Sequence, residues 1–367
     1  MWGSGSVRNL SRPVRFLKSH VSTLLSHPSL EATPGRWPHR WAVLLVCVTF
    51  PLIWVGGLVT THTAGMAVPD WPSTYGYNLF LYPLQQWFFG PWDLFVEHGH
   101  RLLGASSGLV TIGLLVSLWR CEDRRWIKWL GVVALLAVIG QGLLGGMRVI
   151  QDARLLAMIH GCTGPAFFAL CVALAVFTSR QWRQPTFIQR STDASKVQVL
   201  AWGMLVLAYA QLVLGAHLRH MPNGVDRYVF RAVLVMHVFV ACTLFVQGFV
   251  LWWRVGHRHR QVRQLYRAAT ALAMLLTMQI ALGCGTWITN YGWPRWFDRW
   301  SIATGYTIQT NSQMQSLTTT AHVAMGSLIL ATALMTVLAS HRFLSRPTTA
   351  TVSMDKEPAP MTLETVL

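Results

Sequence analysis

The sequence predicts an all-α membrane protein in which eight transmembrane helices form two four-helix bundles related by a pseudo-two-fold axis. Two observations predict the membrane class. The 367-residue chain is 53% hydrophobic but only 12% charged, about half the charged fraction of a typical soluble domain, and its apolar residues form eight long blocks. A third observation, an internal repeat of histidines and glycines, predicts the division into two bundles.

Each apolar block is long enough to cross a hydrocarbon core, which takes about 20 helical residues. Because the backbone must pair its polar groups inside lipid, the blocks are expected to be α-helices. We place them near residues 41–61, 96–119, 126–147, 153–178, 197–217, 228–253, 263–288 and 317–340.

Positive charge is concentrated in alternate loops. Lys and Arg are absent from residues 62–95, and six, four, four, five and three of them lie in 1–40, 120–128, 180–196, 254–267 and 341–367. Because basic loops stay in the cytoplasm, both termini are predicted to be cytoplasmic. Topology therefore explains the net charge of +17, and we expect no binding of nucleic acid.

The two ends of the chain are predicted to be tails. Residues 1–40 are Arg- and Ser-rich and lack the apolar core of a secretory signal. We interpret them as a basic cytoplasmic tail of a protein in the bacterial cytoplasmic membrane. A mitochondrial targeting peptide has the same composition, so the mitochondrial inner membrane remains the alternative. The Pro/Thr-rich residues 341–367 are predicted to be disordered.

The odd-numbered blocks share a signature near their outer ends. The letters QGLLGG, QLVLGA and QIALGC begin at residues 141, 211 and 279, and a weaker version, LIWVGG, begins at residue 52. Such self-similarity indicates a repeat architecture. Small residues at fixed spacing also let transmembrane helices approach closely, which is our interpretation of most of these glycines.

Each even-numbered block carries a histidine in its first turns, with a small residue four positions later. The pairs are His100 with Gly104, His160 with Gly164, His237 with Ala241 and His322 with Gly326. The chain therefore reads as two copies of a four-helix unit. It divides into an N-terminal tail, a first bundle, a cytoplasmic linker, a second bundle and a C-terminal tail, at residues 1–40, 41–178, 179–196, 197–340 and 341–367.

The four histidines are predicted to lie at one depth in the outer leaflet and to bind haem. A single histidine in a transmembrane span is as easily a packed side chain as a ligand, but four histidines at matched positions favour a role as ligands. Residues i and i+4 share a helix face, so each ring lies beside a flat gap that suits a porphyrin. Zinc needs three or four clustered ligands, whereas haem needs one or two. We therefore pair His100 with His160 and His237 with His322.

The first half differs from the second by one acidic residue. Glu97 lies three positions before His100 and four before Arg101, so the three side chains can share a helix face. No carboxylate stands at the equivalent positions of the other three histidines. Glu97 either pairs with Arg101 only, or takes part in chemistry on a bound haem by holding a proton, a charge or a water. His98 is predicted to point elsewhere.

These motifs together resemble the heme A synthase family of integral membrane proteins. The resemblance covers about residues 41–340. It rests on E-x-x-H-R at Glu97, His100 and Arg101, on Q-G-x-L-G-G from residue 141, on the later histidines, and on AGMAVPDWP at 64–72.

The resemblance implies an oxidoreductase that converts the C8 methyl of heme O to a formyl group, making heme A for cytochrome c oxidase. Successive hydroxylations give a diol that loses water. His100 and His160 are implied to hold the substrate haem, with Glu97 catalytic, and His237 and His322 to hold heme b. Heme O synthase and a quinone or another electron acceptor are the partners expected besides membrane lipid.

Three further expectations concern the outer side. Some family members carry a cysteine pair in the first outer loop, but residues 62–95 contain no cysteine, so a thiol relay in that loop is excluded. This aromatic-rich loop either covers the substrate site or forms an interfacial belt. The candidate partners of haem propionates are four arginines near the outer helix ends: Arg101, Arg148, Arg219 and Arg231. The alternative for each is that its side chain extends toward water.

A different class of function remains open at this stage. A dihaem b-type electron-transfer protein would need the four histidines but not Glu97. A transporter built on the repeat is a weaker alternative, because the matched histidines favour a cofactor.

Overall fold

The computed structural model describes residues 1–3, 36–185, 187–222, 224–297, 299–300, 305–310 and 312–347. The chain divides into two units, Met1–Arg36 and Trp37–Leu367, and every helix and strand described below belongs to the second. Most of the predicted tails, 1–40 and 341–367, lies outside the described residues, so their assignment stays a prediction.

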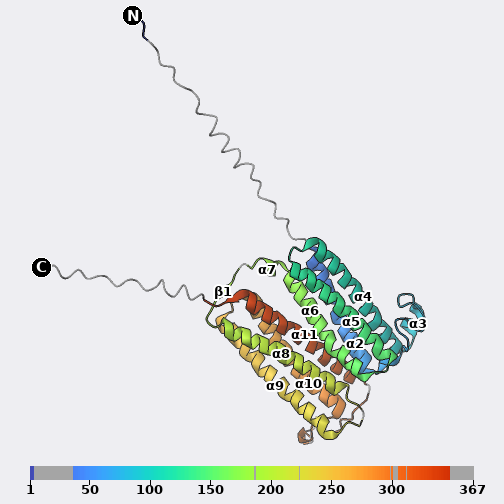
Figure 1. Cartoon of the computed structure of the whole chain (residues 1–367). Coiled ribbons are helices and arrows are strands. Elements are labelled where there is room, and N and C mark those ends of the chain that lie inside the picture. Colours follow the sequence, from blue (N-terminus) through green and yellow to red (C-terminus); the bar gives the residue numbers. More distant parts are fainter. Residues whose placement is uncertain are drawn as a thin grey trace, which may run out of the picture. The chain divides into compact units, whose positions relative to one another are not determined.

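Eight long apolar helices confirm the predicted class of all-α membrane protein (Figure 1). Each boundary lies within five residues of the predicted one. The helices are α2 (Trp37–Thr61), α4 (Trp92–Cys121), α5 (Arg125–Ile150), α6 (Arg154–Thr178), α8 (Ala194–Arg219), α9 (Arg227–Arg258), α10 (Arg263–Tyr291) and α11 (Gln313–Phe343).

The connections at the predicted outer end differ between the two halves. Residues 62–91, which we call the first outer loop, contain the 3-10 helix η1 (Ala64–Met66) and the short helix α3 (Leu84–Phe89). The corresponding connection in the second half, between α8 and α9, spans only residues 220–226. The second half instead has a long connection between α10 and α11, which contains η2 (Arg295–Phe297).

The helices contact one another in two rings. In the first, α2 contacts α4 and α6, and α5 contacts both α4 and α6; in the second, α8 contacts α9 and α11, and α10 contacts both α9 and α11 (Figure 1). Helix α11 also packs against α2 and α6. The pseudo-two-fold relation between two separate bundles stays a prediction, because these contacts join all eight helices into one unit.

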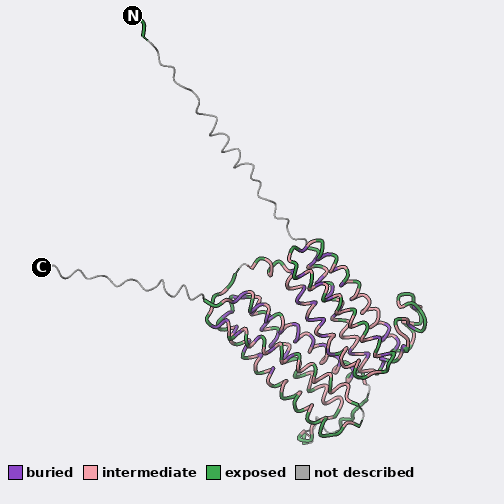
Figure 2. Tube along the Cα trace, in the orientation of Figure 1, coloured by how far each residue is buried: buried purple, intermediate pink, exposed green. Residues whose placement is uncertain are grey.

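The buried hydrophobic core fills the half of each ring that lies away from the histidines. One cluster includes Leu45, Leu114, Ile127 and Leu174, and the other includes Val197, Leu251, Leu265 and Ala333. These residues come from the starts of odd-numbered spans and the ends of even-numbered spans, which is the predicted cytoplasmic half. The burial of each segment can be followed along the trace in Figure 2. The outer half, which carries the histidines, is packed less densely by side chains.

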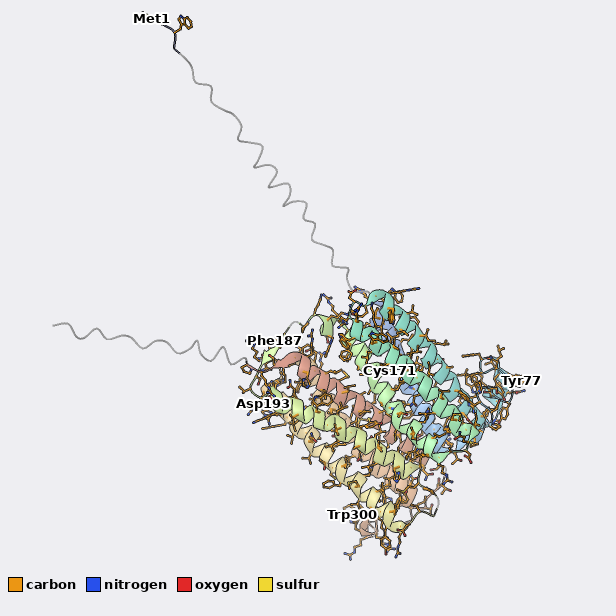
Figure 3. The ribbon with its side chains drawn as sticks, in the orientation of Figure 1. Met1, Tyr77, Cys171, Phe187, Asp193 and Trp300 are labelled. Atoms are coloured by element: carbon orange, nitrogen blue, oxygen red, sulfur yellow. The ribbon has the colours of Figure 1, made fainter. Side chains whose placement is uncertain are left out.

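At the inner end, a buried ionic cluster ties the linker between the halves to the second ring. Asp193 is 4% exposed and lies at the opposite end of the helices from Tyr77 of the first outer loop (Figure 3). Its carboxylate accepts hydrogen bonds from Arg254 Nε at 2.8 Å and from Arg254 Nη2. His259 Nε2 lies 3.4 Å from the same carboxylate.

Two short strands complete this inner end. Strand β1 (Gln189–Arg190), which follows the one-turn helix α7 (Arg180–Arg183), pairs in parallel with β2 (Leu344–Ser345) directly after α11. The linker is therefore held to the end of α11 by backbone hydrogen bonds and to the end of α9 by charge.

The Asp193 cluster predicts a loss of stability in acid. The hydrogen bond from Arg254, opposed by burial, lowers the pKa of Asp193 below its ordinary value. The ion pair therefore stabilises the folded state above the ordinary carboxyl pKa, and this contribution is lost as pH falls through the lowered one. Removing one partner of a buried pair costs about 3 kcal/mol, so we expect Asp193→Ala to lower the thermal midpoint in detergent at pH 7.

Arg258 provides the matched control for this prediction. It also pairs with Asp193, at 3.2 Å, but its side chain is 62% exposed, and exposed pairs contribute about 0–1 kcal/mol. Arg258→Gln should therefore change the midpoint far less than Arg254→Gln. Equal effects of the two arginine variants would contradict the importance of burial.

Candidate functional site

Each of the four predicted histidines packs its ring against a glycine of the preceding transmembrane helix. The edge of the ring that carries Cε1 and Nδ1 faces the glycine, so that a side chain at the glycine would collide with the ring. With the distance from an added Cβ atom to Cε1 in parentheses, the pairs are Gly56 with His100 (2.8 Å), Gly145 with His160 (3.2 Å), Gly215 with His237 (3.2 Å) and Gly283 with His322 (3.2 Å).

These contacts explain the repeated signature of the odd-numbered helices. The glycine of Q-x-x-L-G is the seat of the histidine on the next helix. The sequence indicated close helix packing for most of these glycines, but it could not identify the histidine that each of them faces. A backbone carbonyl one turn before each glycine also acts on the ring electrostatically, at Leu52, Gln141, Gln211 and Gln279.

The Nδ1 atoms of all four histidines are buried, and no described side chain forms a hydrogen bond with them. The four side chains as a whole are only half-buried. Nε2 of these histidines is not among the buried side-chain atoms that lack a partner, so it is the ring nitrogen that remains accessible. Four matched rings that keep Nε2 accessible are arranged as metal ligands would be, because haem iron binds a histidine through one ring nitrogen.

The distances within each pair fit an iron atom. The ring centres of His100 and His160 are 6.3 Å apart, and those of His237 and His322 are 6.4 Å apart. Metal-to-imidazole bonds are about 2 Å and the bound nitrogen lies about 1.1 Å from the ring centre, so two axial histidines should place their centres about 6.2 Å apart. Among the described residues, no three His, Cys, Asp or Glu side chains are grouped to hold a metal ion.

Several of the helices around each pair bury few residues at the level of the rings. Within the described helices, α8 has no buried residue after Ala208, α9 none before Leu244 and α10 none after Leu276. Helix α5 likewise has none between Ala134 and Gly146. Because protein interiors are normally close-packed, helix segments that bury few side chains suit contact with a large apolar group such as a porphyrin.

Glu97 and Arg101 bind the first outer loop. Glu97 is 1% exposed; its Oε1 accepts from Arg101 Nη2 and its Oε2 accepts from the backbone N–H of Val68, both at 2.9 Å. Arg101 also donates to the carbonyls of Val68, Asp70 and Ser73 at 2.6 to 2.8 Å. The pairing of Glu97 with Arg101, expected as one alternative, is thus present, and the terminal nitrogens of Arg101 all have protein partners.

His98 binds the same loop and faces away from the histidine pair. Its Nδ1 lies 3.0 Å from Thr74 Oγ1, and its ring packs against Tyr82 and Trp87 with ring centres 5.0 and 5.2 Å apart. Within the loop, hydrogen bonds from Gly76, Ser73 and Tyr75 outweigh burial and lower the pKa of Asp70. The segment that begins at Glu97 therefore serves both the loop and the first pair.

Among the described residues, neither Arg148 nor Arg219 forms a salt bridge with an acidic side chain, although the charge of Glu97 acts on Arg148. The Arg148 guanidinium lies against Gly65 of the first outer loop and interacts electrostatically with His100 and His160. Arg219 Nη2 donates to the carbonyl of Gly57 at 2.8 Å, and its charge acts on His322. A cation near the membrane interior is costly without an anion, so both arginines suit a ligand carboxylate.

Arg231 lies on a different face of its helix from His237. It is exposed beside Tyr228, Val235 and Phe239, which line a shallow surface hollow on α9. At about 100° per residue, positions 231 and 237 are about 120° apart around the helix. The structure therefore does not bring Arg231 together with the histidine pair, unlike Arg148 and Arg219.

The chain is similar in sequence to a family of known proteins. Residues 92–297, more than half of the chain, match the COX15-CtaA family, described as cytochrome oxidase assembly protein. The chain is 25% identical to the heme A synthase of Bacillus pumilus over 263 residues, which cover 66% of this chain and 83% of that protein. It is 29% identical to the heme A synthase of Symbiobacterium thermophilum over 191 residues, covering 49% and 56%.

The histidine seats predict a selective effect of one methyl group. Gly283→Ala places a Cβ atom 3.2 Å from His322 Cε1, and overpacking costs about 1–3 kcal/mol, so purified protein should retain less haem in its second half. The haem-to-protein ratio from the Soret absorbance measures this. Gly140→Ala is the control, since nothing lies within 4 Å of an added methyl there. Full retention of haem in Gly283→Ala would contradict the role of the seat.

Proposed function

The chain belongs to the COX15-CtaA family of cytochrome oxidase assembly proteins, and from this premise we propose that it is a heme A synthase. In this proposal it is an oxidoreductase of the membrane that oxidises the C8 methyl of heme O to a formyl group. The resemblance to the heme A synthase family found in the sequence is confirmed by the family match and by relatives that carry this name.

The observation that carries the proposal is the pair of matched histidine sites. Each has two accessible rings at the separation that one iron atom requires, at 6.3 and 6.4 Å between ring centres. We propose that His100 and His160 bind the substrate haem and that His237 and His322 bind heme b. When bound, heme b would supply electron transfer between the first site and an external acceptor such as a quinone.

The two unpaired arginines support this assignment of ligands. Haem propionates are carboxylates, and charge-assisted hydrogen bonds to arginine are among the stronger contacts of such groups. We propose that Arg148 binds a propionate of the substrate haem and that Arg219 binds one of heme b. In this proposal Arg101 anchors the first outer loop and does not bind a propionate, because its terminal nitrogens have protein partners. Arg231 does not contact a haem.

Glu97 is proposed as the catalytic residue of the first site. Its carboxylate is held in place by Val68 and Arg101, and it lies close enough to Arg148 to interact with it electrostatically. A fixed carboxylate at the rim of the substrate site can accept a proton that the oxidation of a methyl group releases. The second half has no acidic residue at the equivalent position, Leu234.

A dihaem electron-transfer protein is the second candidate, because four equivalent histidine seats would suit two equivalent haems. The first outer loop and its anchors argue against it. They cover the outer end of the first site, which an electron carrier does not need.

Two further proposals concern the partner and the location. We propose that a heme O synthase delivers heme O, and that the chain lies in the bacterial cytoplasmic membrane with both termini inside.

The first test measures the reaction and the role of Glu97. Cells that express the chain with a source of heme O should contain heme A, detected by chromatography of extracted haems. Glu97→Gln should reduce heme A by about a hundredfold or more, the usual contribution of a general acid or base. Heme A at the wild-type level in Glu97→Gln would refute the catalytic role.

Arg101→Gln separates catalysis from support of the loop. This variant weakens the same loop contacts but leaves the carboxylate in place, so heme A should fall less than in Glu97→Gln. Equal losses in the two variants would show that Glu97 acts through the loop alone.

The second test concerns ligation in the second half. His237→Ala and His322→Ala each remove one of two axial ligands, so the purified protein should lose the heme b spectrum that the wild type shows. The control is His341→Ala, because His341 lies at the inner end of α11 and bonds only Trp202 at 3.0 Å. An unchanged spectrum in both ligand variants would exclude this site.

A further inference from the structure

The first outer loop is fixed at residues on both sides of Trp71. Arg101 Nη1 donates to the carbonyl of Asp70 at 2.6 Å and to that of Ser73 at 2.8 Å. The next residue, Thr74, is fully buried and contacts His98. The position of the Trp71 side chain is therefore set by anchors on α4, close to His100, and not by the loop alone.

The Trp71 indole lies directly on the backbone of α5. A Cβ atom added at Gly146 would overlap the fused bond of the indole, so no larger residue fits there. In the second half, the residues that follow the seats Gly215 and Gly283 are Ala216 and Cys284. Both carry side chains, so the room that α5 provides for an indole has no counterpart on α8 or α10.

This contact places Trp71 at the rim of the first site. Gly146 directly follows Gly145, the seat of His160, and precedes by two residues Arg148, which lies against Gly65 of the same loop. Along α5, the seat of a proposed ligand, the indole contact and the unpaired cation thus fall within four consecutive residues. A haem held by His100 and His160 would have the indole beside it.

Exposure separates Trp71 from an interfacial aromatic belt. The loop exposes other large apolar side chains for that purpose, such as Tyr75, Tyr77, Phe88 and Phe89. Trp71 is instead half-buried and packed on a transmembrane helix. The two functions expected of this loop therefore belong to different residues. Trp71 fits a cover over the site, and the exposed aromatic side chains fit an interfacial belt.

We propose that Trp71 is a substrate-binding residue of the first site, where its indole packs against the edge of the tetrapyrrole and closes the site from water. The inference rests on the proposed function, since it takes the first site to be the one that binds the substrate haem. A flat aromatic wall contributes both apolar contact and geometric preference, and exclusion of water is one way in which a closed site favours chemistry.

The test is a titration of the first site with ferric protoporphyrin IX haem. The full-length chain is purified in detergent from cells without heme O, with its second-site haem retained, and binding is followed by the Soret difference spectrum. An aromatic contact of about 0.5–1.5 kcal/mol predicts that Trp71→Ala binds about three- to tenfold more weakly. Trp71→Phe should recover most of this loss, because it keeps an aromatic ring.

A double-mutant cycle tests the contact itself. Gly146→Ala should displace the indole and weaken haem binding, but it should cost nothing further in the Trp71→Ala background, where no ring remains to collide. Additive effects would overturn the contact. Trp296→Ala is the matched control: its indole belongs to the long outer loop of the second half and is 75% exposed, so first-site binding should be unchanged.

The outcomes separate this inference from the proposed function. Wild-type binding by Trp71→Ala, or equal loss of haem from both sites, would overturn the inference even if the cells make heme A. If the wild type makes no heme A but the titration and the cycle behave as predicted, the proposed function fails while Trp71 remains a haem-binding residue.

Discussion

The seating of each histidine ring on a glycine is the contact on which the rest of the site depends. A ring packed edge-on against a helix backbone fixes both the distance between the two helices and the direction of Nε2. Because the four seats are alike, the two pairs have nearly equal ring separations, 6.3 and 6.4 Å. The repeated glycine is therefore a constraint on ligand geometry as well as on helix packing.

The distribution of packing follows from the same constraint. Hydrophobic clusters hold each ring of helices together in the inner half, so the outer half is free to enclose a large group. A buried cation has a high energetic cost in such a place unless an anion accompanies it. Among the described residues, Arg148 and Arg219 form no salt bridge with a protein carboxylate, which is consistent with ligands that bring their own carboxylates.

The sequence predicts those features that follow from periodicity. Hydropathy predicted all eight spans, and the recurrence of histidine at matched positions predicted which four rings lie at one level. It could not assign each glycine to its histidine, or Trp71 to Gly146, because these contacts depend on which helices are neighbours. The angle between positions 231 and 237 around a helix was enough to predict that Arg231 and His237 lie on different faces. The hydrogen-bond partners of Arg101 lie in a loop about 30 residues away, so the spacing of neighbouring residues could not predict them.

The difference between the halves is consequently a difference of surroundings, not of ligands. Both pairs have the same seats, but only the first pair has beside it a carboxylate, Glu97, that also anchors a loop over the outer end. The same short segment that supplies His100 thus holds the cover through Glu97, His98 and Arg101. Because the proposed ligand and the anchors of the loop lie within one helix turn, a ligand that shifted His100 would also shift the loop above it.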